Sequence, residues 1–131
     1  MQLPERVRRI IEERAEEVGF AALARAADAM SAAYREGRKA RLGDAERVAA
    51  YLVTRMPATY AAACKVLAEM AGMRIESVLD IGAGTGAASL AVRQYFPNAA
   101  ITIVEPDPAM AELARQAMIY LTQAAEKRIS A

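Results

Sequence analysis

Histidine and tryptophan are absent from this 131-residue sequence, and Cys64 is its single cysteine. Without histidine the chain has no Ser–His or Cys–His pair for nucleophilic catalysis, and it lacks a common zinc ligand. One cysteine excludes both an internal disulfide and a cluster of thiolate ligands. The sequence therefore predicts no metal site, and we expect Cys64 to be a small buried apolar residue.

The sequence also has no large excess of either charge and no long apolar run. The 17 Lys and Arg residues nearly balance the 16 Asp and Glu residues, so the net charge of +1 indicates no polyanionic partner for the molecule as a whole. No apolar stretch approaches the roughly 20 residues of a membrane-spanning helix. The opening stretch MQLPERVRRIIEERAEE carries charges of both signs and lacks the apolar core of a signal peptide. We expect a cytoplasmic protein with no membrane partner.

Hydrophobic residues are abundant, at 55% of the total, and in the first half they recur every three or four positions. This period predicts amphipathic helices over 3–18, 20–34, 44–56 and 57–70. On the second helix the apolar stripe runs from Phe20 to Tyr34, and on the fourth helix it includes Val66. We expect all three side chains to face inward.

Several residues mark where these helices begin and end. Asp44 is a favourable N-cap for the third helix. Pro57 disfavours helical backbone at Met56, so we expect a break there. Gly72 suits the left-handed cap that commonly ends a helix. The helical N-terminal domain is therefore predicted to occupy residues 1–72.

From Met73 onward the period changes. Two short apolar runs, 74–82 and 99–105, are typical of strands buried on both faces in a parallel sheet. A helix over 86–96 lies between them, and Asp107 and Pro108 are in the N-cap and first-turn positions of a final helix. The predicted class is α/β, with residues 73–131 forming the first β-α-β-α part of an incomplete Rossmann-like domain.

Three glycines follow the first predicted strand within five positions, in the stretch VLDIGAGTGAASLAV. A glycine-rich turn before a helix lets backbone N–H groups approach a ligand closely. A dinucleotide site, G-x-G-x-x-G, would need glycine at position 87, where this chain has Ala87, and no lysine follows as in a P-loop. The remaining pattern is D-x-G-x-G-x-G, beginning at Asp80. The same residues are also compatible with a tight turn that binds nothing.

The pattern resembles motif I of the class I S-adenosylmethionine-dependent methyltransferases. Glu105 follows Gly86 by 19 residues (105 − 86), near the roughly 20 expected of a carboxylate that bonds ribose hydroxyls. The resemblance implies that Asp80 lies near the cofactor's amino group, that Glu105 binds the ribose and that Pro106 lies against the adenine. The loop residues that would contact the cofactor are Gly82, Ala83, Gly84 and Gly86.

Longer stretches resemble one particular family. The segments SAAYR, RMPATYAA, VLDIGAGTGAAS and IVEPDPAM occur in the order found in the small-ribosomal-subunit-associated methyltransferase-like proteins of bacteria and mitochondria. The resemblance implies a partner in the small ribosomal subunit or its rRNA. Family members continue through further strands, and many carry cysteines for an iron–sulfur cluster, which one cysteine cannot hold. We therefore expect an N-terminal fragment that binds S-adenosylmethionine weakly or not at all.

A basic segment after the second predicted helix is the candidate RNA contact. It contains Arg35, Arg38, Lys39 and Arg41 against the single acid Glu36. Each phosphate neutralised by these side chains would add to a salt-sensitive affinity. A solvated loop between two helices explains the same charges equally well.

Two functions remain open. The first is an S-adenosylmethionine-dependent methyltransferase acting on rRNA and inactive as a fragment, because groups that hold the nucleophile usually follow later strands; its catalytic residues are unknown. The second is a non-catalytic ribosome-assembly or RNA-binding module with a methyltransferase fold. The two predicted strands would lack outer partners, so we also expect a homo-oligomer formed through their exposed edges.

Overall fold

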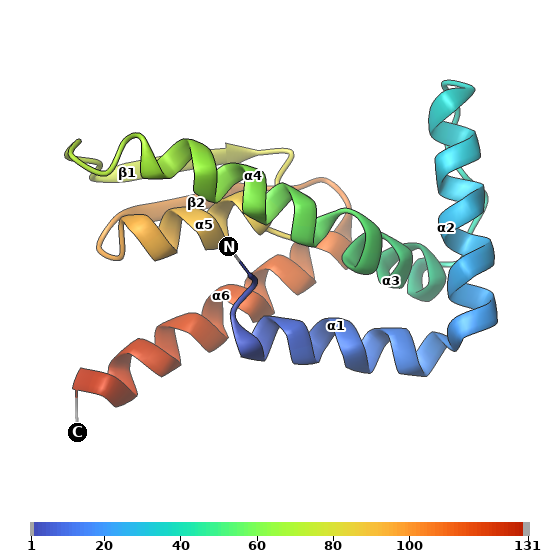
Figure 1. Cartoon of the computed structure of the whole chain (residues 1–131), viewed down its shortest axis with the longest axis horizontal. Coiled ribbons are helices and arrows are strands. Elements are labelled where there is room, and N and C mark those ends of the chain that lie inside the picture. The colour runs from blue at the N-terminus through green and yellow to red at the C-terminus, as the bar shows by residue number, and fades with distance from the viewer. Residues whose placement is uncertain (1, 130–131) are drawn as a thin grey trace.

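The computed structural model describes residues 2–129, with residues 120–129 described by their backbone alone. The elements in chain order are α1 (Glu5–Val18), α2 (Phe20–Arg35), α3 (Asp44–Thr54), α4 (Met56–Ala68), β1 (Ser77–Ile81), α5 (Ala87–Tyr95), β2 (Ala100–Val104) and α6 (Pro108–Ile129). This order confirms the α/β class, with helices preceding an incomplete β-α-β-α unit. α2 lies at the outer edge of the molecule and runs across the other helices (Figure 1).

The break between α3 and α4 falls at Arg55, one residue earlier than predicted. Met56 is the first residue of α4, so the expectation that it leaves helical conformation is wrong. Arg55 keeps right-handed backbone angles, with φ −109° and ψ −43°. Pro57 has no N–H for the Val53 carbonyl, so the helical ladder is interrupted there without a sharp turn.

The two predicted helix caps at Asp44 and Gly72 are wrong. Gly43 occupies the cap position of α3, and the Asp44 carboxylate accepts a 3.0 Å hydrogen bond from Arg47 instead. α4 ends at Ala68, and the N–H groups of the next residues donate to carbonyls three positions back. These tighter bonds satisfy the end of the helix, so no left-handed residue is needed and Gly72 does not adopt positive φ.

β1 and β2 pair in parallel, from Ser77 opposite Ala100 to Ile81 opposite Val104, with α5 as the crossover. Burial alternates along both strands. Leu79, Ile81 and Val104 are exposed by 59%, 74% and 47%. The prediction of strands buried on both faces is therefore wrong: helices cover one face, and nothing within residues 2–129 covers the other.

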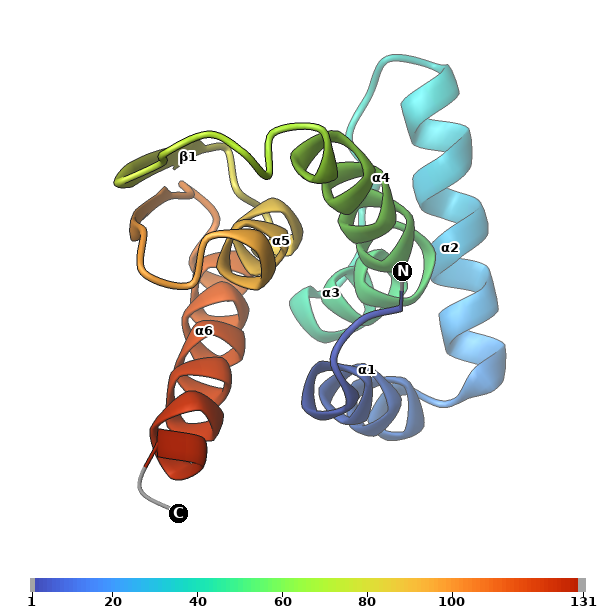
Figure 2. The same ribbon diagram turned by 60° about the vertical axis from the view of Figure 1, so that its left-hand side comes forward.

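One hydrophobic cluster joins α1, α3 and α4 to α5 and α6. Its buried members are Leu3, Val7, Val48, Leu52, Met56, Tyr60, Cys64, Ala87, Leu90, Ala91, Met110, Leu113 and Ala117. The burial of Cys64 confirms its predicted role as an apolar core residue. α4 and α5 lie side by side at the junction (Figure 2). This packing fixes the helical segment against the β-α-β-α unit.

Three side chains predicted to face inward are exposed instead. Phe20, Tyr34 and Val66 have exposed fractions of 86%, 77% and 62%. α2 packs against α1 and α3, and its fully buried positions are the small residues Ala26 and Ala33. Within the described residues, the ends of its apolar stripe are consequently not buried by another helix. Within the described part of the chain, no helix is both long and apolar enough to cross a membrane.

Candidate functional site

The glycine loop, residues 82–86, connects β1 to α5. Its φ angles are +70° at Gly82, +58° at Gly84 and +84° at Gly86. Side chains other than glycine are strained in this region, which explains the three glycines conformationally. The N–H of Gly82 donates to the Val104 carbonyl over 2.8 Å. The loop is therefore tied to the carboxyl end of β2.

Besides their positive φ angles, close packing is a second reason for glycine at two of these positions. A Cβ added at Gly84 would lie 3.1 Å from the Tyr51 hydroxyl, and one at Gly86 would lie 3.0 Å from the Ala114 Cβ. α3 and α6 thus contact the loop directly. A Cβ at Gly82 would meet no atom within 4 Å. Among the described residues, Gly82 is therefore the loop glycine that leaves an open approach for a ligand.

The middle of the loop is held by short internal contacts. The N–H of Gly86 donates to the carbonyl of half-buried Ala83 over 2.9 Å. Thr85 is 1% exposed, and its Oγ1 has no hydrogen-bond partner in the described part of the chain. An unpaired buried hydroxyl costs about 1–3 kcal/mol. Sequence reasoning did not single out Thr85, because only burial distinguishes it from an ordinary loop threonine.

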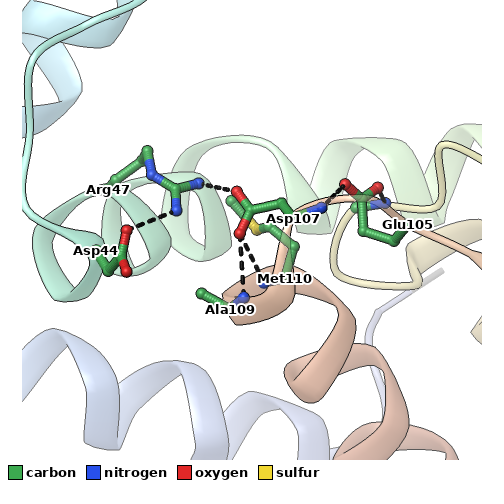
Figure 3. Close-up of polar contacts among 7 residues, drawn as sticks. Asp44, Arg47, Glu105, Asp107, Ala109 and Met110 are labelled. Carbon is green, nitrogen blue, oxygen red and sulfur yellow. Dashed lines mark hydrogen bonds and ion pairs between the residues drawn. The ribbon is translucent and has the colours of Figure 1, made fainter.

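Glu105 follows β2 directly, and its carboxylate reaches the glycine loop. Oε2 accepts the N–H of Gly84 over 2.7 Å, and Oε1 accepts the N–H of Asp107 over 3.1 Å (Figure 3). The structure thereby brings together two parts of the predicted site that lie 21 residues apart in sequence. A carboxylate has about four lone-pair positions, so each oxygen keeps one for a further donor such as a hydroxyl.

Asp107 connects this carboxylate to α3. Its Oδ1 accepts the N–H groups of Ala109 and Met110 over 3.1 and 3.4 Å, which confirms the predicted cap of α6. Its Oδ2 pairs with Arg47 (Figure 3). The hydrogen bond from Arg47 lowers the pKa of Asp107 below its ordinary value, and the same bond raises the pKa of Arg47.

Sequence reasoning missed Arg47, which lies 60 residues from Asp107. The available signal was its spacing from Tyr51. Residues four positions apart share one face of a helix, and on α3 that face meets Asp107 through Arg47 and the glycine loop through Tyr51. The N-terminal helices therefore contact the candidate site at two points.

The remaining predicted cofactor residues lie beside this centre. The Oδ2 atom of Asp80 accepts a 2.6 Å hydrogen bond from buried Ser89, which links β1 to α5. Its Oδ1 has no hydrogen bond within the described residues. Pro106 is exposed between Glu105 and Asp107. A cofactor contact by Asp80 or Pro106 stays a prediction.

The basic segment lies on the surface between α2 and α3. Arg35 ends α2, and Arg38, Lys39 and Arg41 are exposed in the connection 36–43. Arg38 Nε donates to Glu36 over 2.5 Å. Arg38 and Lys39, but neither of the other two, line a pocket of about 410 Å³ that we name the basic pocket. Its lining is Met30, Ala33, Tyr34, Arg38, Lys39, Ala40, Leu42, Arg47 and Asp107.

Tyr60 is a buried phenol in the core, away from the glycine loop in sequence. Burial raises the pKa of the Tyr60 phenol, with a further contribution from its hydrogen bond with Cys64. The phenol therefore stays protonated at neutral pH. Throughout the described ranges, no group of three or more Cys, Asp or Glu residues is placed to hold a metal ion.

Comparison with known proteins connects this geometry to a family. The family model described as "Rsm22: Mitochondrial small ribosomal subunit Rsm22" matches residues 45–130. No curated protein and no solved structure matches the chain. The matched region contains Arg47, the glycine loop, Glu105 and Asp107, and it covers well over half of the sequence. The chain therefore belongs to the Rsm22 family of the mitochondrial small ribosomal subunit.

Proposed function

We propose that this protein is a methyltransferase-related factor of the small ribosomal subunit that binds rRNA and, weakly, S-adenosylmethionine. Membership of the Rsm22 family supports the ribosomal role. The observation that carries the cofactor role is the position of Glu105, 2.7 Å from the Gly84 N–H at the carboxyl ends of two parallel strands. Ligands of open α/β sheets bind at such ends.

The residues of the loop fit this cofactor. Each Glu105 oxygen has a lone pair left for one of two ribose hydroxyls. The open side of Gly82 admits the methionine part, and Asp80 Oδ1 is available to the amino group. Pro106 offers an exposed apolar surface to the adenine. When bound, the cofactor supplies an electrophilic methyl group.

Equilibrium dialysis with labelled S-adenosylmethionine tests the cofactor role. We expect a Kd of roughly 0.1–1 mM, which is a weak affinity of about −4 to −5.5 kcal/mol. Glu105→Gln should weaken binding about tenfold or more, because hydrogen bonds to a charged group contribute about 1.5–3 kcal/mol. Glu69→Gln, an exposed change at the end of α4, is the matched control. Equal binding by both variants would refute the assignment of Glu105.

A non-catalytic RNA-binding module is the second candidate, and one observation favours it. The carboxylates around the loop are all engaged: Asp80 with Ser89, Asp107 with Arg47, and Glu105 with two backbone N–H groups. In the described part of the chain, every carboxylate beside the loop therefore has a structural partner, and none is held for proton abstraction alone. The module predicts that small-subunit rRNA binds without acquiring a labelled methyl group. Incorporation of the label would exclude the module and support the enzyme.

Self-association is a separate proposal. Within the described residues, β1 and β2 form a sheet of two strands, so each has an outer edge with unpaired N–H and C=O groups. The exposed face beside these edges carries Leu79, Ile81 and Val104. We propose that two copies of the chain pair through these strand edges and the exposed face beside them.

A further inference from the structure

The basic pocket has the size of a small-ligand site. Its volume of about 410 Å³ lies within the range of roughly 300–1,000 Å³ typical of such sites. α2, the connection 36–43, the start of α3 and Asp107 form its walls. Met30, Ala33 and Leu42 make part of the lining apolar, while charged side chains make the rest polar. This combination suits a ligand with one flat apolar part and one charged part.

The charges of the pocket favour an anion. Its lining holds three cations, Arg38, Lys39 and Arg47, against the single carboxylate of Asp107. Arg47 is paired with Asp107, and Arg38 is paired with Glu36. Lys39 is exposed and makes no ion pair within the described residues. A phosphate could therefore pair with the Lys39 ammonium group, which has no ion-pair partner within the described residues. It could also pair with the Arg38 guanidinium group, whose partner Glu36 is exposed.

Tyr34 supplies an aromatic surface at the same place. It lines the pocket, is 77% exposed and carries the Arg55 guanidinium 5.4 Å from its ring centroid. At this exposure most of the ring surface is open to a ligand. Exposed aromatic rings flanked by cations are the platforms on which proteins stack the bases of single-stranded nucleic acids.

From these observations we infer that the basic pocket binds one nucleotide of single-stranded RNA. The base stacks on Tyr34, the apolar lining holds its edge, and Lys39 and Arg38 contact the adjoining phosphates. The choice of RNA rests on the proposed function of the protein in the small ribosomal subunit. An acidic peptide would use the cations but would have no use for the exposed ring.

The pocket is joined to the candidate cofactor site. Asp107 lines the pocket with its side chain, and its N–H donates to Glu105 over 3.1 Å. Arg47, which also lines the pocket, pairs with Asp107 (Figure 3). A nucleotide in the basic pocket would therefore neighbour the carboxylate assigned to the ribose of the cofactor. This arrangement places RNA on the side of the site formed by the N-terminal helices.

Fluorescence anisotropy with a labelled ten-nucleotide oligouridylate and the full chain tests the inference. Tyr34→Ala should weaken binding about 5- to 100-fold, because stacking of one base contributes about 1–3 kcal/mol. Tyr34→Phe should retain the wild-type affinity, because it keeps the ring. Lys39→Gln should lower the slope of log K against log salt by about 0.7, the value for one phosphate contact of a single strand.

Matched controls come from the same molecule. Phe20→Ala removes an equally exposed ring from the other end of α2, roughly 20 Å away along the helix. Lys65→Gln removes an exposed ammonium group from α4. Both variants should bind the RNA like the wild type. Equal losses in Tyr34→Ala and Phe20→Ala would overturn the inference.

Further outcomes separate this inference from the proposed function. If the wild type binds RNA but Tyr34→Ala and Lys39→Gln are both neutral, the pocket assignment fails and the RNA-binding function stands. If the wild type binds no RNA, both fail. Photo-crosslinking of a 4-thiouridine oligonucleotide should label the peptide containing Tyr34, and labelling confined to other peptides would refute the pocket. Polyglutamate that competes with the labelled oligonucleotide as effectively as unlabelled RNA does would show that the pocket selects negative charge alone. This result would also refute the assignment of the pocket to RNA.

Discussion

Single residues make the polar contacts between the two halves of the molecule. Glu105 accepts hydrogen bonds from the glycine loop and from Asp107, and Asp107 pairs with Arg47 of α3. Asp107 therefore acts twice, as the cap of α6 and as the partner of a distant helix. At this scale the structure makes predictions that depend on one side chain and its immediate neighbours.

Asp107→Ala should lower the free energy of unfolding by about 1–2 kcal/mol, because it removes a helix cap and one partner of a partly exposed ion pair. Asp107→Asn is the matched control, since asparagine caps helices about as well as aspartate. It should cost less than 1 kcal/mol. Urea unfolding of the three proteins measures both differences, and equal losses would contradict the cap.

The ion pair also predicts a pH dependence. The pKa of the Asp107 carboxyl is lower in the folded protein than in the unfolded chain. Asp107 therefore contributes stability that is present above its unfolded pKa of about 3.9 and is lost as the pH falls through the pKa of the folded state. The difference in free energy of unfolding between wild type and Asp107→Asn should be constant from about pH 5 to about pH 7 and should vanish in more acidic solution. A difference that grew on acidification would contradict the Arg47 pairing.

The glycines of the loop should respond differently to alanine. Gly84→Ala introduces strain at φ +58° and a contact at 3.1 Å with the Tyr51 hydroxyl, so we expect a loss of about 2–3 kcal/mol. Gly82→Ala adds strain at φ +70° without a clash and should cost about 1–2 kcal/mol. Adding Tyr51→Phe to Gly84→Ala should restore part of the loss. Thermal unfolding compares the variants, and an additive double mutant would refute the Tyr51 contact.

Removal of the unpaired Thr85 hydroxyl should increase stability, in contrast to the glycine substitutions. Thr85→Val replaces it with a methyl group of similar size in a site that offers no hydrogen-bond partner among the described residues. We expect stability to rise by about 1 kcal/mol, the lower end of the penalty for an unpaired buried group. Thr85→Ser keeps the hydroxyl and should give no gain. Destabilisation by valine in a urea titration would show that the hydroxyl has a partner.

At the scale of elements, the sequence predicted the number, order and type of the helices and strands. Asp107 and Pro108 were recognisable because the cap of α6 depends on adjacent residues. Phe20 and Tyr34 were misplaced because helical period gives a stripe but not the partner that covers it. The Arg47–Asp107 pair and the packing of Tyr51 on Gly84 depend on contacts between distant segments, which spacing along the chain does not encode.

Helix α5 should be the most protected element and α2 among the least. α5 buries Ala87, Ser89, Leu90, Ala91 and Val92, whereas α2 buries only Ala26 and Ala33 among its described residues. Local opening requires less free energy where fewer apolar contacts are broken. Amide hydrogen exchange should therefore be slower in α5 than in α2. Faster exchange in α5 would contradict the central position assigned to it.

At the scale of the whole molecule, the packing of α4 on α5 joins the helical segment to the β-α-β-α unit, and α3 adds polar contacts at the carboxyl ends of the strands. The glycine loop is linked to the basic pocket there, because Glu105 accepts hydrogen bonds from Gly84 and from Asp107, and Asp107 lines the pocket. The sheet face that carries Leu79, Ile81 and Val104 is separate from these contacts and stays exposed within residues 2–129. The function and the assembly of the protein therefore make separate predictions.

Light scattering after size exclusion should give about twice the monomer mass of 14.1 kDa if copies pair through the sheet. Ile81→Lys should shift the protein toward monomer by placing a charge on the exposed face beside the edge. Val66→Lys, an exposed position on α4, should leave the mass unchanged. A stable monomer of the wild type at micromolar concentration would contradict self-association.

The most direct test of the central claim is a titration of the ¹⁵N-labelled chain with S-adenosylhomocysteine, followed by amide chemical shifts. We predict progressive shifts in the glycine loop, residues 82–86, and at Glu105 and Asp107, together with a Kd of roughly 0.1–1 mM. The same shifts should shrink in Glu105→Gln and persist in Glu69→Gln. An unchanged spectrum at millimolar ligand, or shifts confined to other elements, would contradict the assignment of this loop as a cofactor site.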